Sequence, residues 1–105
     1  MDKVRLELPA DALKEFCARH KIKSLALFGS VLREDFGPSS DIDVLVEYED
    51  RARHDLWDHF YMQEELERML GRHVDLINRQ ALEQSQNWIR RQAILESAQT
   101  VYVSR

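Results

Sequence analysis

The chain alternates short apolar runs, which are typical of strands, with longer segments whose apolar residues recur at helical spacing. The first predicted helix follows Pro9, a residue suited to an initial helical turn, and carries the apolar stripe Leu13, Phe16 and Cys17. It is expected to end near His20. The longest predicted helix covers residues 55–70 and stops before Gly71, because glycine is favoured directly after a helix.

Apolar runs of strand length complete the pattern. They cover residues 24–28, 42–48, 73–77 and 100–103, with further helix expected within 80–98 and a short helix over 31–35. Alternating strands and helices predict an α/β fold class with a small sheet of about four strands. The pattern leaves the parallel or antiparallel sense of the sheet open.

Composition narrows the class of protein. At 105 residues, with 44% hydrophobic and 32% charged, the chain can bury one core, so a single domain is expected over residues 1–105. No apolar run approaches the roughly 18 residues of a membrane span, and the charged start lacks the apolar centre of a signal peptide. A cytoplasmic protein without membrane association is therefore expected. The lone Cys17 excludes an internal disulfide framework.

Charge is unevenly distributed along the chain. The net charge of −4 argues against direct nucleic-acid binding, which depends on phosphate neutralisation by Lys and Arg. Nine acids but only two basic residues fall within residues 34–58. Solvated loops account for most of these acids, whereas a divalent cation needs only two or three.

Two of these acids open an apolar strand. Asp41 and Asp43 are separated by one residue, so their side chains are expected on one face of the strand, roughly 7 Å apart along the backbone. Their carboxylates can converge on one hard cation, for which Mg²⁺ is the natural candidate. Asp75 adds an acid within the apolar run 73–77, either as a third metal ligand and general base or as a strand-end acid facing water.

A candidate phosphate-binding turn precedes the acid pair. Gly29 allows a close backbone turn, and Ser30 would start the short helix, where free N–H groups favour an anion. Each feature alone is common on protein surfaces. Together they predict a site for a metal-bound triphosphate.

The spacing of Gly29-Ser30, Asp41-Ile42-Asp43 and Asp75 resembles the signature of the DNA-polymerase-β nucleotidyltransferase superfamily. Most of the chain, from about Leu13 to Val103, is similar to the minimal nucleotidyltransferases (MNT proteins), antitoxins paired with HEPN-domain toxins. The resemblance implies a small mixed sheet flanked by helices.

The resemblance also implies roles for these residues. Gly29 and Ser30 would hold the β- and γ-phosphates of ATP, and the three acids would form the Mg²⁺ site and catalytic centre. The implied reaction transfers AMP from ATP to a tyrosine hydroxyl of the cognate HEPN ribonuclease, in a hetero-oligomer with that toxin. Many relatives read GSxARG after the strand, whereas Leu32 and Glu34 replace two small residues here. Arg33 is kept and would either contact the triphosphate or face solvent.

Two other functions compete with this interpretation. One is a non-catalytic antitoxin that occludes its toxin and retains a vestigial nucleotide site, against which the clustered acids argue. The other is transfer to a nucleic-acid or small-molecule acceptor, which the small size and acidic charge disfavour. For a macromolecular acceptor, the residues Trp57, Phe60, Tyr61 and Met62 offer a contact surface, although core packing explains them equally well. A second, weaker candidate surface contains Trp88, Ile89, Arg90 and Arg91.

Overall fold

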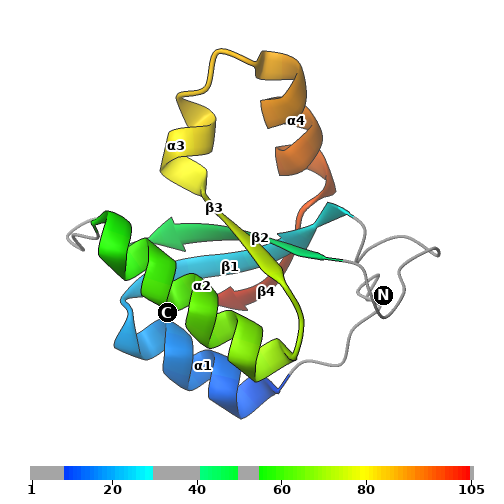
Figure 1. The fold of residues 1–105 in the computed structure, drawn as a ribbon. Coiled ribbons are helices and arrows are strands. Elements are labelled where there is room, and N and C mark those ends of the chain that lie inside the picture. The colour runs from blue at the N-terminus through cyan, green and yellow to red at the C-terminus, as the bar shows by residue number, and fades with distance from the viewer. Residues whose placement is uncertain (1–8, 30–40, 50–54, 105) are drawn as a thin grey trace.

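A four-stranded sheet with helices on both faces forms the body of the protein (Figure 1). The computed structural model describes residues 9–29, 41–49 and 55–104. In chain order the elements are α1 (Ala10–Arg19), β1 (Ile22–Phe28), β2 (Ile42–Tyr48), α2 (Leu56–Leu70), β3 (Val74–Asn78), α3 (Arg79–Glu83), α4 (Trp88–Ser97) and β4 (Gln99–Val103). These elements confirm the predicted ones within the described ranges. Residues 84–87 divide the predicted helical segment 80–98 in two, and the short helix predicted over 31–35 lies outside the described residues.

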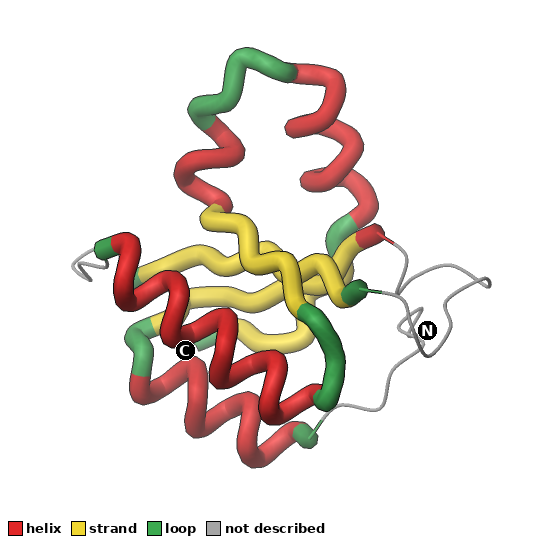
Figure 2. Tube along the Cα trace, viewed as in Figure 1, coloured by secondary structure: helices red, strands yellow, loops and turns green. Residues whose placement is uncertain are grey.

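The sheet has the strand order β3-β2-β1-β4 (Figure 2). β1 pairs antiparallel with both β2 and β4, whereas β2 and β3 run parallel. The sheet is therefore mixed, and the fold class of a small mixed sheet flanked by helices is confirmed. The parallel pair matters for the site, because it places the N-terminal ends of β2 and β3 at the same end of the sheet.

The two faces of the sheet have different cores. On β2, Val44 and Val46 face α1 and α2, while Leu45 packs on the opposite face with α3 and α4. The larger core contains Leu13, Phe16 and Cys17 from α1 and Met62 and Leu66 from α2, besides strand residues. Phe16 and Met62 are fully buried, and burying a side chain of that size contributes roughly 1.5–3 kcal/mol. Most of the core thus lies on one face, and the other face is more thinly covered.

Cys17 belongs to this larger core and is fully buried. Burial raises the pKa of the Cys17 thiol to about 12, because the thiolate would lose its hydration. A structural role for Cys17 follows, since the reactive thiolate form is strongly disfavoured at neutral pH.

Both ends of α2 are fixed by residues that the sequence places there. Asp55 accepts a hydrogen bond from the Asp58 backbone N–H at 2.8 Å, and the Asp55 N–H donates to Asp58 Oδ2 at 3.0 Å, forming a capping box. At the other end Gly71 has a left-handed φ of 69° and donates its N–H to the Glu67 carbonyl at 2.8 Å. These caps determine where the connection to β3 begins.

Three polar side chains of α2 bind the outer edge of β3, the edge that pairs with no strand of the described residues. Glu67 Oε2 accepts the Val74 N–H at 3.0 Å, and Gln63 Oε1 accepts the Leu76 N–H at 3.3 Å. His59 Nε2 lies 2.8 Å from the Leu76 carbonyl oxygen, so this nitrogen carries the donated proton. The spacing of four residues places all three on one face of α2. Their contacts satisfy backbone groups on both sides of Asp75.

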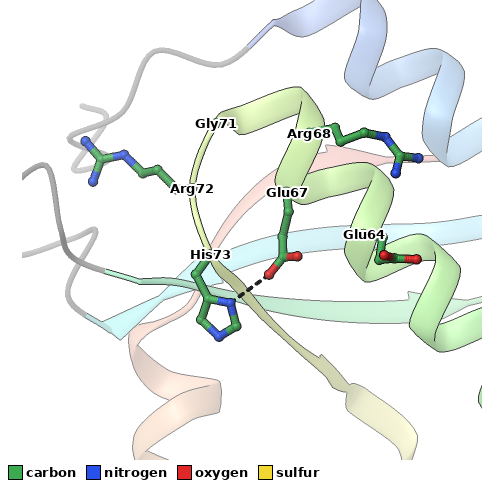
Figure 3. Close-up of a pocket in the computed structure, with 6 residues that line it drawn as sticks. All are labelled: Glu64, Glu67, Arg68, Gly71, Arg72 and His73. Carbon is green, nitrogen blue, oxygen red and sulfur yellow. Dashed lines mark ion pairs between the residues drawn. The ribbon is translucent and has the colours of Figure 1, made fainter.

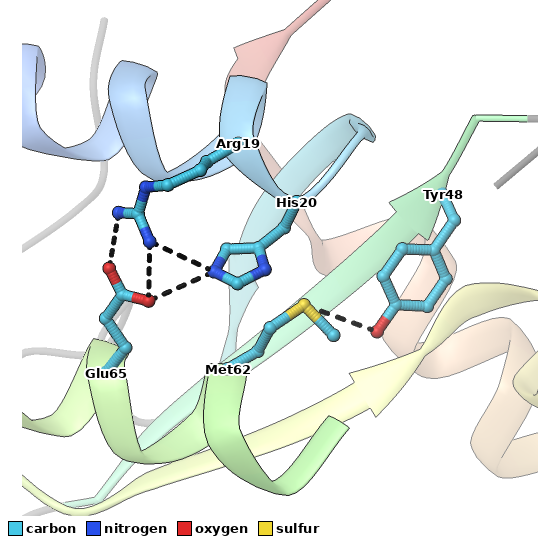
Figure 4. A network of polar contacts seen from close by, with 5 residues as sticks. All are labelled: Arg19, His20, Tyr48, Met62 and Glu65. Atoms are coloured by element: carbon cyan, nitrogen blue, oxygen red, sulfur yellow. Dashed lines mark hydrogen bonds and ion pairs between the residues drawn. The ribbon is translucent and has the colours of Figure 1, made fainter. Parts of the chain in front are cut away.

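An ion-pair cluster joins α1 to α2 (Figure 4). Arg19 Nη2 lies 2.5 Å from Glu65 Oε2, and His20 Nε2 lies 3.0 Å from Glu65 Oε1. The hydrogen bond from Arg19, reinforced by His20, lowers the pKa of Glu65 to about 2. Beside this cluster Tyr48 donates its hydroxyl proton to Met62 Sδ, and burial raises the pKa of Tyr48 to about 12.

We expect Gln63→Ala to weaken β3 at its outer edge. The Leu76 N–H loses its acceptor, which lowers the free energy of unfolding by about 1 kcal/mol and accelerates hydrogen exchange of that amide. Exchange measured by NMR, with chemical denaturation, tests both effects. Glu64→Ala on the same helix is the control, because Glu64 makes no hydrogen bond to the described residues of β3. Unchanged exchange at Leu76 in the Gln63 variant would contradict this assignment.

Stability should depend on pH through Glu65. A depressed pKa in the folded state means that the ionised carboxylate stabilises the fold, fully above its ordinary value of 4.5 and progressively less as pH falls towards about 2. Glu65→Gln should lower the unfolding free energy at pH 7 by about 1 kcal/mol, a small value because Arg19 is half exposed. Denaturation curves between pH 2 and pH 7 should show this difference shrinking below about pH 4.5. A difference that stays constant over this range would rule the ion pair out as its source.

Candidate active site

Three strands converge where two of the predicted acids lie. In the parallel ladder Asp43 of β2 is the register partner of Asp75 of β3, and in the antiparallel ladder Asp43 is the partner of Phe28 at the end of β1. Gly29 follows Phe28 directly. The pairing pattern thus brings together three positions that are widely separated in sequence.

A pocket of about 310 Å³ opens at this end of the sheet. Its lining comprises Phe28, Gly29, Asp43, Asp75 and Ile77 from the strand region, and Arg90, Ala93, Ile94 and Ser97 from α4. Asp43 is half-buried and Asp75 is exposed. Strand ends therefore form one wall of the pocket, and one face of α4 forms the other.

Gly29 is required here by both conformation and space. Its φ of 77° is left-handed, a region that residues with a Cβ rarely adopt. A Cβ placed on Gly29 would overlap Asp43 Oδ2 and lie 3.1 Å from Asp43 Cγ. The backbone at Gly29 consequently packs directly against the carboxylate, and this close approach defines one side of the pocket.

The other predicted site residues have different positions. Asp41 lies one residue before β2, is exposed, and does not line this pocket. Ser30 and Arg33 fall outside the described residues. The structure therefore brings Gly29, Asp43 and Asp75 together, and the functional assignment of all six residues stays a prediction.

The donor set at the pocket suits a hard divalent cation. Mg²⁺ typically takes one or two carboxylates from protein and completes its shell with waters and substrate phosphates. Asp43 and Asp75, in register on neighbouring strands, supply two such carboxylates. Across residues 9–29, 41–49 and 55–104, no group of three or more His, Cys, Asp or Glu side chains is arranged to hold a metal ion.

A second pocket, of about 470 Å³, lies where α2 turns into β3 (Figure 3). Glu67 and His73 meet across it, with Oε2 and Nδ1 2.7 Å apart, and the His73 carbonyl accepts the Ile42 N–H at 2.9 Å. These contacts tie the connection before β3 to the start of β2. We assign this region a supporting role, because its bonds hold the two strands that carry Asp43 and Asp75.

Sequence reasoning did not connect α4 with this pocket. Arg90, Ala93, Ile94 and Ser97 follow the i, i+3, i+4, i+7 spacing of one helical face, which the sequence reveals. The course of the chain through residues 79–87 determines which part of the sheet this face of α4 contacts. The periodicity of α4 itself does not reveal that course.

The contact surface predicted on α2 is largely confirmed as exposed. Leu56, Trp57, Phe60 and Tyr61 are between 48% and 80% exposed, and we call these four residues the α2 aromatic surface. The three rings contact one another with centroids 5.9–6.5 Å apart. Met62 was wrongly included in the prediction, because it points into the core and is fully buried.

Comparison with known proteins indicates the family to which the chain belongs. The model of the nucleotidyltransferase domain family matches residues 10–101. A candidate protein adenylyltransferase of Methanocaldococcus jannaschii is 38% identical over 64 residues, covering 61% of this chain and 64% of the relative. Protein adenylyltransferase MntA of Thermococcus cleftensis is 33% identical over 69 residues, covering 66% of this chain and 68% of that protein. The match thus spans a little under two thirds of the first relative's own length.

Solved structures share the fold. A toxin–antitoxin complex with AMP-PNP has a TM-score of 0.69 at 20% identity, covering 93% of this chain and 76% of the matched one. A tri-AMPylated HEPN toxin of Shewanella oneidensis in complex with its MNT antitoxin gives a TM-score of 0.61 at 20% identity, covering 90% and 70%. No helix in the described part of the chain is long and apolar enough to cross a membrane.

Gly29→Ala should disturb the pocket beyond its cost to the backbone. Gly71→Ala is the matched control, because Gly71 has a similar φ of 69° but open space where a Cβ would stand. Both variants should lose about 1–2 kcal/mol of stability through left-handed strain. Only Gly29→Ala should displace the Asp43 carboxylate and weaken Mg²⁺-dependent AMP-PNP binding, measured by calorimetry. Equal binding by the two variants would show that the Gly29 contact with Asp43 is unimportant for the nucleotide.

Proposed function

The chain belongs to the nucleotidyltransferase domain family, and from this membership we propose that it transfers AMP from ATP to a tyrosine hydroxyl of a HEPN-domain toxin. In this role it acts as the antitoxin of that toxin. The observation that carries the proposal is the placement of Asp43 beside Asp75 in a pocket bounded by Gly29. Two acids at neighbouring register positions repel each other, and a divalent cation bound between them relieves that repulsion.

Similar proteins support ATP as the proposed substrate and a HEPN toxin as the proposed acceptor. Relatives named protein adenylyltransferases favour AMP transfer to a protein. A neighbour crystallised with AMP-PNP favours ATP as the nucleotide, and a tri-AMPylated HEPN toxin in another complex favours this class of acceptor. The pocket volume of about 310 Å³ lies at the lower end of the range for small-molecule sites, consistent with a nucleotide whose phosphates enter first.

The proposed reaction is an in-line displacement at the α-phosphorus of ATP. The acceptor hydroxyl oxygen forms a bond to that phosphorus, the bond between the phosphorus and its bridging oxygen to the β-phosphate breaks, and pyrophosphate leaves. The hydroxyl proton passes to a carboxylate, for which Asp75 is the candidate because it is exposed at the pocket. Gly29 and Ser30 are proposed to hold the β- and γ-phosphates, and Arg33 to assist them.

Asp43, Asp75 and the neighbouring Asp41 are proposed to hold Mg²⁺. When bound, the ion supplies charge neutralisation of the phosphates and orientation of the α-phosphorus. Asp41 and Asp43 are two residues apart, so the strand period directs them to the same side. The Asp43 carboxylate packs directly against the backbone of Gly29, and this contact restricts the orientations that the carboxylate can take.

The acceptor is proposed to arrive on the toxin as a separate chain. The small pocket leaves little room for an acceptor groove within this domain. The α2 aromatic surface offers apolar contact area of the composition that protein interfaces favour. It lies at the start of α2, at the end of the sheet opposite Asp43 and Asp75 (Figure 1). Binding of a partner and AMP transfer are therefore separable by mutation.

This separation also supports a second candidate function. An antitoxin could neutralise its toxin through the exposed α2 aromatic surface alone, with no transfer of AMP. Such a protein would inhibit equally well without ATP.

Asp43→Asn and Asp41→Asn should each abolish AMP transfer, with rates falling about 100-fold or more, because a neutral amide is a poor ligand for Mg²⁺. Intact-mass spectrometry of the toxin after incubation with ATP and Mg²⁺ measures the gain of AMP. The fold and the toxin complex should persist, as checked by circular dichroism and size-exclusion chromatography.

Glu64→Gln removes the same charge from α2, outside the lining of this pocket, and should transfer AMP at the wild-type rate. Transfer at the wild-type rate by either aspartate variant would overturn the metal-site assignment. Inhibition of the toxin that persists in full in the Asp43→Asn variant would favour neutralisation by occlusion.

A further inference from the structure

Helix α4 brings a cation to the pocket that holds Asp43 and Asp75. Among the described residues that line this pocket, Arg90 is the one lysine or arginine. It lies on the same face of α4 as Ala93, Ile94 and Ser97. Ile94 is buried in the smaller core and anchors this helical face against the sheet. Arg90 is thus held at the pocket by the packing of its own helix.

The guanidinium of Arg90 forms no ion pair or hydrogen bond within the described part of the chain. Neighbouring arginines are engaged in structural contacts instead. Arg91 Nη1 donates to the Ser85 carbonyl at 2.9 Å and so fixes the connection before α4. Arg79 lies 3.4 Å from Glu83 and 3.6 Å from Glu47. Arg90 is also more exposed than either of them.

Arg90 is not paired with the acids of its own pocket. No ion pair within 4.0 Å joins its guanidinium to Asp43 or Asp75, although all three residues line one space of about 310 Å³. Arg90 on the helix wall and the two aspartates on the strand wall thus line one pocket without an ion pair between them, and a ligand in the pocket can lie between the two walls. The charge pattern, acids on the strand wall and a cation on the helix wall, suits a ligand that carries both a metal-bound and a free anionic portion.

We propose that Arg90 binds the triphosphate of the nucleotide and makes the site prefer ATP over AMP. This proposal rests on the proposed function of the pocket and adds a specificity-determining residue to it. The planar guanidinium matches two phosphate oxygens at once, as a lysine does not. In the reaction Arg90 stabilises the negative charge that develops on the departing pyrophosphate.

Arg90→Gln should therefore weaken binding of AMP-PNP about tenfold or more, while the affinity for AMP changes by less than about twofold. Isothermal titration calorimetry in Mg²⁺ measures both ligands on the full chain. Arg90→Lys should fall between the wild type and the glutamine variant, because the charge remains but the two-pronged contact is lost. Arg68→Gln is the control for charge: Arg68 lines the second pocket, on α2, and its loss should leave both affinities unchanged.

Each other outcome overturns the proposal in a recognisable way. Unchanged AMP-PNP affinity in Arg90→Gln removes Arg90 from the site, and the proposed function stands if Asp43→Asn still abolishes AMP transfer. An equal loss for AMP-PNP and AMP places Arg90 at the nucleoside or α-phosphate. A wild-type chain that binds no AMP-PNP in Mg²⁺ overturns both this proposal and the proposed function.

Discussion

The parallel pairing of β2 with β3 is the constraint on which the pocket depends, because it sets Asp43 directly beside Asp75. Two like charges at neighbouring register positions repel each other, so this pairing must be held by contacts elsewhere. On its inner side β3 has the ladder to β2, and on its outer side it has Gln63 and Glu67 of α2. A helix with polar residues at every fourth position thus replaces a fifth strand and keeps β3 in register.

One face of the sheet carries most of the hydrophobic core, and the other face carries the pocket. The face under α1 and α2 buries Phe16, Met62 and most of the large apolar side chains. The opposite face has a smaller core, with Leu82 from α3 and Ile94 from α4, and the pocket lies where that core ends. Because the alternation of a strand directs successive side chains to opposite faces, Asp43 is placed on the thin face while Ile42 and Val44 enter the main core. The acids are consequently accessible without a polar group interrupting the larger core.

The sequence allowed the strands and helices of the described residues to be predicted because their signals are local. Gly71 and the spacing of Leu66 and Leu70 determine the end of α2 without reference to the rest of the chain. That Asp43 and Asp75 meet in one site was inferred from residue chemistry and from a family resemblance, whereas their pairing in register depends on strand order and packing, which the sequence leaves open. Arg90 was not predicted as a pocket residue for the same reason. The path of the chain through α3 determines that this face of α4 lies against the strand ends. Met62 was misjudged because it directly follows Tyr61 in the sequence and is apolar like the three exposed aromatic residues nearby. Its position on the helix nevertheless directs it into the core.

Net charge is a poor guide to which anion such a chain can bind. A value of −4 disfavours long polyanions, whose affinity grows with the number of phosphates neutralised along an extended basic surface. A nucleotide presents its few charges within one pocket, where two carboxylates with a divalent cation and a single arginine can balance them. Asp43 and Asp75 with Arg90 across from them give this chain such a local arrangement despite its acidic total. Total charge therefore bears on whether a long polyanion can bind, whereas the arrangement of charge across one end of the sheet decides whether a compact anion such as a nucleoside triphosphate can.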